Sequence, residues 1–571
     1  MIPGRLGPAD RDDAWNRLDD GEFDVLVVGG GVTGAGSALD ATTRGLSTAM
    51  VEARDYASGT SSRSSKLFHG GLRYLEQLDF GLVREALRER ELMVTRLAPH
   101  LVRPVSFLYP LKHRIWERPY VSAGLILYDT LGGGSSLPRH RRLTRAAARA
   151  LCPALRRDAF VGAMLYYDAQ ADDARHTMTL ARTAARHGAV VRNSTEVQEL
   201  LRDGDRITGA ELRDTDTGAT CRVRARVVIN CTGVWTDDVQ GLSGDRGRFR
   251  VRASKGIHLL VPRDRINSDT GLILRTEKSV LFVIPWGNRW VIGTTDTDWN
   301  LDRAHPAASR RDIEYLLERV NKVLAPAITA EDVVGVYAGL RPLLSGESEQ
   351  TSQLSREHAV ARSVPGLVSV AGGKYTTYRV MARDAVDAAV ADLGRPATAS
   401  VTEHVPLLGA EGYAAMVNRL KPLSVRLKVS EWRLDRLLRR YGALVEEVLA
   451  PAAEDPGLLL PVPGAPDYIN AEIRYAVTHE GAVHLDDILA RRTRISIEYT
   501  HRGVESARPV ADVVAPILGW SEETVKREVE TYLARVEAER ASQEQTEDVA
   551  ADAARLLAPE LRRARDTRHL R

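Results

Sequence analysis

The chain contains few cysteines and no long apolar run. Only three of its 571 residues are cysteine (Cys152, Cys221 and Cys231), and their spacing matches no metal-ligand motif. Such a small, odd number argues against a disulfide framework and favours a reduced, cytosolic setting. No window approaches 18 apolar residues, and the N-terminal stretch is polar and acidic with no apolar signal core. We therefore predict no metal site and no transmembrane helix, which leaves peripheral contact with a membrane open.

Charge is also nearly balanced. The formal net charge is only +3, so nothing overall points to nucleic acid as a partner. Apolar residues make up 44% and charged residues 27% of the chain, as in ordinary soluble globular proteins. A length of 571 residues is too great for one core and suits about three domains.

The most informative stretch is Asp24–Arg54. An apolar run, Asp24–Val28, leads into Gly29, Gly31 and Gly34 in G-x-G-x-x-G spacing, and a predicted helix and a second strand follow. The first glycine permits the tight turn, the second lets backbone approach a pyrophosphate, and the third lets helix and strand touch. Glu52 ends the second strand, where its carboxylate can accept a hydrogen bond from a ribose hydroxyl. This pattern predicts dinucleotide binding without deciding between a nicotinamide and a flavin.

Three later stretches carry similar signals. The loop 56–74 is rich in serine and glycine, which suits a loop that encloses a ligand. Small residues end a buried strand at Gly233, and a further strand runs into a turn at Gly373 and Lys374, after which Thr376 can cap a long helix. Ala163–Asp168 and the following helix predict that the nucleotide domain resumes there after an insertion, and residues 255–339 predict a mostly antiparallel sheet.

These pieces together resemble the FAD-dependent, quinone-linked glycerol-3-phosphate dehydrogenases over about 22–532. The motifs that carry the resemblance occur in the family's order: GGGVTG (29–34), HGGLRY (69–74), YYDAQADDAR (166–175), IPWGNRWVIGTTDTD (284–298), AGLRPLL (338–344), AGGKYTTYR (371–379) and RRTRI (491–495). The resemblance implies a fold like that of glutathione reductase and the amino-acid oxidases. This α/β fold combines a Rossmann-like FAD-binding domain, an antiparallel-sheet substrate domain and a C-terminal all-helical cap.

The predicted domain boundaries follow from this resemblance. They are a lead-in at 1–21, a discontinuous FAD domain at 22–100, 163–254 and 345–395, a substrate domain at 101–162 and 255–344, a helical domain at 401–537, and a tail at 538–571. The tail is polar, falls outside the resemblance, and is expected to be frayed helix or disordered and mobile.

The resemblance implies oxidation of sn-glycerol 3-phosphate to dihydroxyacetone phosphate, with noncovalent FAD and a membrane quinone as acceptor. Arg341, Lys374 and His69 are its catalytic candidates, with His69 preferred as proton acceptor over Lys374 or Arg341. Arg73, Tyr74 and Arg356 complete a basic substrate pocket, which suits a dianionic phosphate. The candidates for cofactor binding are Gly29, Gly31, Gly34, Glu52, Ser61, Ser62, Ser65, Gly233, Gly373 and Thr376.

Other interpretations stay open at this stage. The chain could be a glycerol-3-phosphate oxidase that uses O₂, a related flavin amine or hydroxy-acid oxidase, or a flavin-free nicotinamide-binding regulator. A homodimer is compatible with the resemblance. A quinone acceptor requires contact with the inner face of the cell membrane. Leu111–Tyr128 has a suitable mixture of residues (Trp116, Tyr120 and Leu125–Tyr128 beside Lys112, Arg114 and Arg118), with domain core as the alternative.

Overall fold

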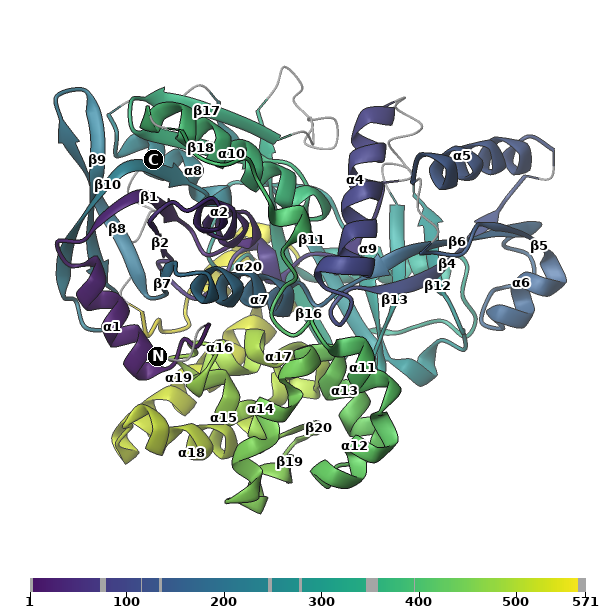
Figure 1. Cartoon of the computed structure of the whole chain (residues 1–571). Coiled ribbons are helices and arrows are strands. Elements are labelled where there is room, and N and C mark those ends of the chain that lie inside the picture. Colours follow the sequence, from purple (N-terminus) through teal and green to yellow (C-terminus); the bar gives the residue numbers. More distant parts are fainter. Residues whose placement is uncertain are drawn as a thin grey trace.

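The computed structural model describes residues 4–71, 79–113, 115–132, 136–244, 249–276, 280–345, 358–394 and 396–562. Figure 1 shows three units: a sheet covered by helices, a second sheet beside it, and a mostly helical domain that lies below both. This arrangement matches the predicted combination of a Rossmann-like sheet, a mostly antiparallel second sheet and a helical C-terminal unit.

The first sheet carries the glycine-rich turn. In it, β1 (Glu22–Val28) lies between β2 (Thr48–Val51) and β10 (Thr220–Asn230), and all three run parallel. The other strands are β7 (Val190–Arg192) beside β2, β18 (Leu367–Gly372) and β17 (His358–Val364) beyond β10, and the antiparallel pair β8 (Thr195–Asp203) and β9 (Arg206–Asp214). Both faces of the parallel strands are covered, so the sequences of these strands are unbroken apolar runs. This pattern made the strands predictable.

Helices cover the two faces of β1 separately. Val25 and Val27 pack in one core with α2 (Val32–Thr43), α7 (Asp173–Arg186) and α10 (Tyr378–Leu393). The alternate residues Leu26 and Val28 pack in another core with α1 (Pro8–Leu18). The predicted lead-in is therefore a helix whose Leu18 is fully buried.

The second sheet has ten strands and forms the wall of the site opposite the first sheet. Its strands are β3 (Leu67–Phe68), β4 (Arg103–Leu111), β5 (Arg141–Thr144), β6 (Gly162–Gln170), β11 (Val251–Pro262), β12 (Gly271–Arg275), β13 (Val280–Trp286), β14 (Arg289–Gly293), β15 (Thr297–Trp299) and β16 (Gly335–Leu344). The helices attached to it are α4 (Phe80–Leu92), α5 (Glu117–Gly132), α6 (Arg145–Leu151) and α9 (Arg310–Asn321).

One predicted strand lies in a different sheet from the one expected. Residues 163–168 do form a strand, β6, but it pairs antiparallel with β4 in the second sheet instead of resuming the nucleotide domain. The first sheet resumes only with α7 and β7. Because β6 is buried on both faces for most of its length, its composition resembles that of a parallel core strand.

The C-terminal unit is largely helical. Its α-helices are α11 (Tyr413–Asn418), α12 (Leu420–Leu427), α13 (Glu431–Tyr441), α14 (Val445–Leu449), α15 (Asn470–Thr478), α16 (Leu485–Asp487), α17 (Ile495–Glu498), α18 (Ala507–Leu518), α19 (Glu522–Glu544) and α20 (Asp548–Arg555). A short hairpin, β19 (Pro461–Val462) and β20 (Ala465–Ile469), departs from the predicted all-helical cap.

The RRTRI motif ties the helical unit to the first sheet. Arg492 forms a bidentate ion pair with Asp55, with both N–O distances 2.7 Å, and Arg491 pairs with the same carboxylate. Arg494 pairs with Asp172 at 2.7 Å. All three arginines are buried, so the motif makes packing contacts between domains.

The described part of the tail, 538–562, differs from the frayed or disordered segment that was predicted. The helix α19 continues to Glu544, and α20 packs through Ala551 against Val234 and Leu340. Lys255 pairs with Asp548 at 2.6 Å, which joins α20 to the second sheet. The prediction of disorder was based on the weak apolar stripe of this segment. It was wrong because a few small residues and ion pairs suffice to dock the segment.

Candidate active site

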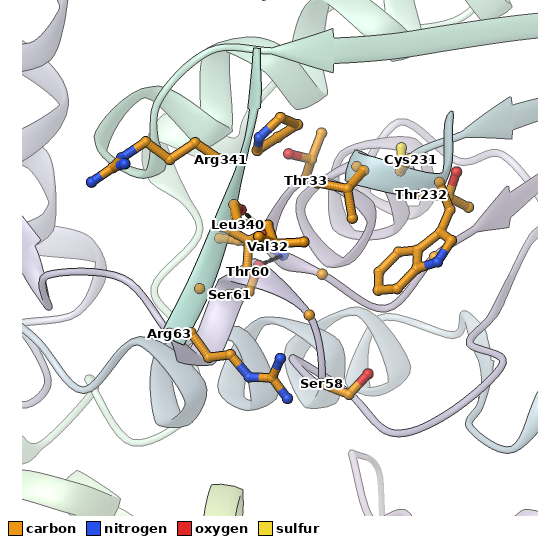
Figure 2. A pocket seen from close by; sticks show the side chains of 18 of the residues that line it. Val32, Thr33, Ser58, Thr60, Ser61, Arg63, Cys231, Thr232, Leu340 and Arg341 are labelled. Carbon is orange, nitrogen blue, oxygen red and sulfur yellow. Dashed lines mark hydrogen bonds between the residues drawn. The ribbon is translucent and has the colours of Figure 1, made fainter. Parts of the chain in front are cut away.

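An elongated cavity runs between the first and second sheets. It begins at the turn after β1 and ends beside Arg341 and Lys374, and Figure 2 shows part of its lining. The carboxyl ends of β1, β10 and β18 open into it, which is where open α/β sheets bind ligands.

The glycine turn leaves space that side chains would fill. Gly29 has φ +112°, and a Cβ at Gly34 would lie 1.9 Å from the Gly29 carbonyl oxygen, so only glycine fits at that position. Gly31 caps the N-terminus of α2 and lines the cavity. The exposed N–H groups of this helix end suit a pyrophosphate, so the turn fits the dinucleotide that the sequence predicted.

Glu52 lines the cavity and also braces this turn. Its two carboxylate oxygens accept from the Gly30 N–H at 2.7 Å and the Arg54 N–H at 2.8 Å. Burial raises the pKa of the Glu52 carboxyl, while these two hydrogen bonds oppose the shift. A bound ribose would therefore meet a carboxylate whose position is already fixed.

The three predicted serines have different positions. The Ser61 hydroxyl accepts from the Val32 N–H at 2.9 Å at the start of α2, and the Ser65 hydroxyl lies 2.9 Å from His258 Nε2. Both line the cavity. Ser62 borders a separate, smaller cavity, and its carbonyl accepts from Lys66 and Arg494. The structure thus brings Ser61 and Ser65 to the site but not Ser62.

The far end of the cavity is lined by basic residues from several chain segments. Arg341 leaves β16, and its guanidinium donates to Thr294 Oγ1 at 3.2 Å and to the Thr295 carbonyl at 3.1 Å. It also pairs with Asp296 at 3.3 Å. Lys374 follows β18 and lines the same end. Two cationic donors at one end of the cavity suit a phosphate.

His69 lies at this end as well. Its backbone N–H donates to Thr376 Oγ1 at 3.1 Å, and the Thr376 hydroxyl donates back to the His69 carbonyl at 3.2 Å. The two predicted residues Thr376 and His69 therefore hold each other in place. Gly233 and Gly373, also predicted, line the cavity with φ of +60° and +75°.

Arg73, Tyr74 and Arg356 lie outside the described residues, and so does Arg114. Their assignments stay predictions.

His258 on β11 is a site residue that the sequence analysis missed. It is buried, its Nε2 meets Ser65, and it lines the cavity next to Arg341. Burial, followed by the charges of Arg341 and Lys66, holds the pKa of His258 well below its usual range. No local signal marks it, because His258 lies within an apolar strand.

Comparisons with known proteins support a flavin site. The family described as "FAD dependent oxidoreductase" matches residues 24–379, and the "C-terminal domain of alpha-glycerophosphate oxidase" matches residues 400–525. A glycerol-3-phosphate dehydrogenase of Mycobacterium leprae is 62% identical over 98% of this chain and 95% of its own length.

More distant relatives are also glycerol-3-phosphate dehydrogenases. The mitochondrial glycerol-3-phosphate dehydrogenase of Homo sapiens is 36% identical over 89% of this chain and 72% of its own length. The crystal structure of the Bacillus halodurans glycerol-3-phosphate dehydrogenase complexed with FAD superposes with a TM-score of 0.76 and 28% identity, covering 93% of this chain and 98% of that one.

Proposed function

Because the chain belongs to the FAD-dependent oxidoreductases and, within them, to the glycerol-3-phosphate dehydrogenases, we propose that it oxidises sn-glycerol 3-phosphate to dihydroxyacetone phosphate. The observation that carries this proposal is the single cavity that joins the glycine turn at Gly29 to the basic cluster at Arg341 and Lys374. One end suits a dinucleotide, and the other suits a small phosphate ester.

FAD supplies the hydride acceptor when it is bound. The chain's own residues perform the remaining tasks. Gly29 and Gly31 would accommodate the diphosphate, Gly34 lets α2 lie close to the turn, and Glu52 and Gly233 line the same cavity. Arg341 and Lys374, with the predicted Arg73, Tyr74 and Arg356, bind the substrate phosphate and hydroxyls. Arginine forks suit a dianion better than a single ammonium does.

The C2 hydroxyl must lose its proton as hydride leaves C2, so a base is needed. The cavity offers two histidines, His69 and His258. The low pKa keeps His258 neutral, but burial, its largest cause, also weakens the imidazole as a base, and a bound phosphate dianion would offset only the smaller contributions of Arg341 and Lys66. We propose His258 as the acceptor, with the sequence candidate His69 as the alternative that mutation distinguishes.

We propose further that electrons leave to a membrane quinone through contact with the inner face of the cell membrane. No described helix is long and apolar enough to cross a bilayer. The helix α5 supports surface contact because Trp116, Tyr120 and Ile126 are about half exposed, at 53%, 51% and 50%. Figure 1 shows α4 and α5 standing together at one edge of the molecule, away from the helical domain.

Part of the predicted membrane segment is core instead. Leu125 is fully buried and Tyr128 nearly so, because Tyr128 packs on α4 and its hydroxyl donates to Asp168. The contact face is therefore the outer side of α5, with the exposed Lys112 and His113 beside it. Aromatic side chains flanked by cations suit an interface with anionic lipid.

The deciding experiment measures turnover of sn-glycerol 3-phosphate with a dye acceptor, with oxygen uptake followed in parallel. We expect dye reduction with little oxygen consumption. Oxygen uptake at the rate of dye reduction would identify an oxidase. Turnover of glycine, sarcosine or a hydroxy acid with none of the phosphate ester would identify the related oxidases instead.

A further inference from the structure

A second cavity lies behind the active site, where the tail meets the other units. Six residues define this basic cavity: Arg63, Ser496, Arg502, Arg535, Glu539 and Arg555. Arg63 comes from the loop after β2, Ser496 from α17, Arg535 from α19 and Arg555 from α20. Its volume of about 70 Å³ is several times the roughly 10–15 Å³ that one water requires.

Positive charge exceeds negative charge in this cavity. Glu539 is shared by three guanidinium groups, with distances of 2.6 Å to Arg502, 2.9 Å to Arg555 and 3.5 Å to Arg535. Asp486 pairs with Arg535 at 3.1 Å but is shared with Arg491. Glu560 also interacts with Arg535 and Arg555, so three carboxylates, two of them shared, face the guanidinium groups of Arg63, Arg502, Arg535 and Arg555.

Arg63 has no carboxylate partner among the residues that the structure describes. Its guanidinium donates to the Ala304 carbonyl at 3.0 Å. Burial, then Arg535 and Arg491, lowers the pKa of Arg63 to about 9, and burial lowers that of Arg555 to about 10. Both pKa shifts show that the charged guanidinium is destabilised at its position, because buried charges require compensation.

Ser496 gives a second, independent indication of a ligand. It is 1% exposed, and its hydroxyl has no hydrogen-bond partner among the described residues. A buried hydroxyl without a partner is costly unless a ligand or water accepts its proton. The neighbouring backbone is strained as well, since His501 and Arg502 both have positive φ, at 52° and 57°. Such strain gathers at ligand sites.

We propose that the basic cavity binds one phosphate-class oxyanion, either inorganic phosphate or the phosphate group of a small metabolite. Arg63, Arg535 and Arg555 would hold it, with Ser496 donating its hydroxyl. Because these residues belong to different units, the anion would fasten α20 to the first sheet. In turn, Ala551 of α20 belongs to one apolar cluster with Val234 and Leu340, two residues that line the dinucleotide cavity.

The anion is distinct from the substrate and from the dinucleotide. Arg63 borders both cavities, whereas Arg535 and Arg555 border the second cavity but not the first. Figure 2 shows the Arg63 and Arg341 side chains extending in opposite directions. The proposal therefore does not depend on the substrate assigned above.

The test is calorimetric titration of the FAD-loaded protein with inorganic phosphate at constant ionic strength. The background variant Arg341→Ala removes the main contact proposed for the substrate phosphate. In that background we expect one remaining phosphate site. Arg555→Gln and Ser496→Ala should each weaken it, with the dissociation constant rising tenfold or more for Arg555→Gln. The control Arg508→Gln changes an exposed arginine of α18 that pairs with Asp512 and should bind as before.

A parallel titration with sn-glycerol 3-phosphate separates the two sources of the phosphate group. Binding of both ligands in the Arg341→Ala background points to a metabolite phosphate, and binding of inorganic phosphate alone points to the free ion. If Arg555→Gln loses its flavin, Ser496→Ala decides, because it removes one hydroxyl and no charge. Loss of all phosphate binding with Arg341→Ala, or unchanged binding in both cavity variants, would overturn the proposal.

Discussion

His258 stacks on Tyr337, with ring centroids 4.8 Å apart and planes inclined by 11°. The stack fixes the plane of the imidazole, and the hydrogen bond from Nε2 to Ser65 Oγ fixes its rotation within that plane. Tyr337 is held in turn by its own hydroxyl, which donates to the Ser64 carbonyl at 2.9 Å. A positioned and neutral imidazole beside Arg341 has the attributes of a general base.

This geometry predicts that His258→Gln lowers kcat far more than His69→Gln does. General-base catalysis contributes about 10²–10⁴-fold, so a loss of that order is expected for His258→Gln with sn-glycerol 3-phosphate and a dye. Flavin content and melting temperature serve as controls for folding. A larger loss of kcat with His69→Gln would identify His69 as the proton acceptor instead.

A second prediction concerns acid sensitivity. Burial lowers the pKa of His100 and of His176 to about 3, whereas an unfolded histidine titrates near 6.5. Because the folded pKa lies below the unfolded one, the unfolded state binds more protons as pH falls. Stability is therefore retained above about pH 6.5 and lost below it, by up to about 1.4 kcal/mol per pH unit for each histidine.

The melting temperature, measured by calorimetry from pH 8 to pH 4, should drop progressively on the acid side. His176→Gln should flatten that slope, and His404→Gln, at an exposed position, should not. Equal slopes in all three proteins would show that carboxylate titration dominates instead.

The third prediction concerns the phosphate contact. Arg341→Ala should lower kcat/KM for sn-glycerol 3-phosphate by about tenfold or more, since each charge-assisted hydrogen bond contributes roughly 1.5–3 kcal/mol. Arg252→Ala is the matched control, because Arg252 lies on the neighbouring β11 and pairs with Asp298 at the edge of the sheet. Unchanged kinetics in a flavin-loaded Arg341→Ala protein would exclude Arg341 from the substrate site.

The fourth prediction concerns the cofactor. The purified protein should be yellow and release FAD on denaturation. Gly34→Ala should abolish flavin retention, because the new Cβ would lie 1.9 Å from the Gly29 carbonyl oxygen. Gly45→Ala, just beyond the other end of α2, meets open space and should keep its flavin despite some strain at φ +80°. Absorbance at the flavin bands after gel filtration measures the flavin retained by each variant. A yellow Gly34→Ala protein would contradict the steric argument.

Sequence patterns predicted the parts of the fold that local rules determine. The turn at Gly29 and the buried strands β1, β2 and β18 have signatures that depend only on neighbouring residues. The sheet to which β6 belongs does not follow from local pattern, because a strand buried on both faces looks alike in either sheet. Docking of α20 depends on Lys255, nearly 300 positions away, so composition alone could not reveal it.

The site shows the same division. Glycines and serines near Gly29 were predictable from spacing, and Arg341 and Lys374 from the family's motifs. His258 was not predictable, because a histidine within an apolar strand is usually interpreted as a core residue. The pairing of β11 with β16 places His258 opposite Tyr337, and the Arg341 guanidinium extends over Gly256 toward it. Ser61 borders the larger cavity and Ser62 the smaller one, because adjacent serines in a short helical turn face different directions.

The last prediction concerns the membrane. The protein should sediment with anionic vesicles at low salt, and binding should weaken as the Debye length falls from about 30 Å at 0.01 M to about 3 Å at 1 M. Trp116→Glu with Tyr120→Glu places two charges on the outer face of α5, where they would repel anionic headgroups and remove aromatic contact. Vesicle binding and quinone-dependent turnover should then fall together, while turnover with a water-soluble dye persists.

Trp432→Glu provides the matched control, because Trp432 is also 53% exposed but lies on α13 in the helical domain. It should leave vesicle binding and both activities unchanged if α5 is the contact face. Loss of vesicle binding with Trp432→Glu, but not with the α5 variant, would move the contact to the helical domain. A parallel fall of dye and quinone turnover in the α5 variant, with vesicle binding intact, would show instead that the outer face of α5 supports the active site. Measuring vesicle binding together with dye and quinone turnover thus distinguishes a surface that docks on the membrane from one that supports the active site.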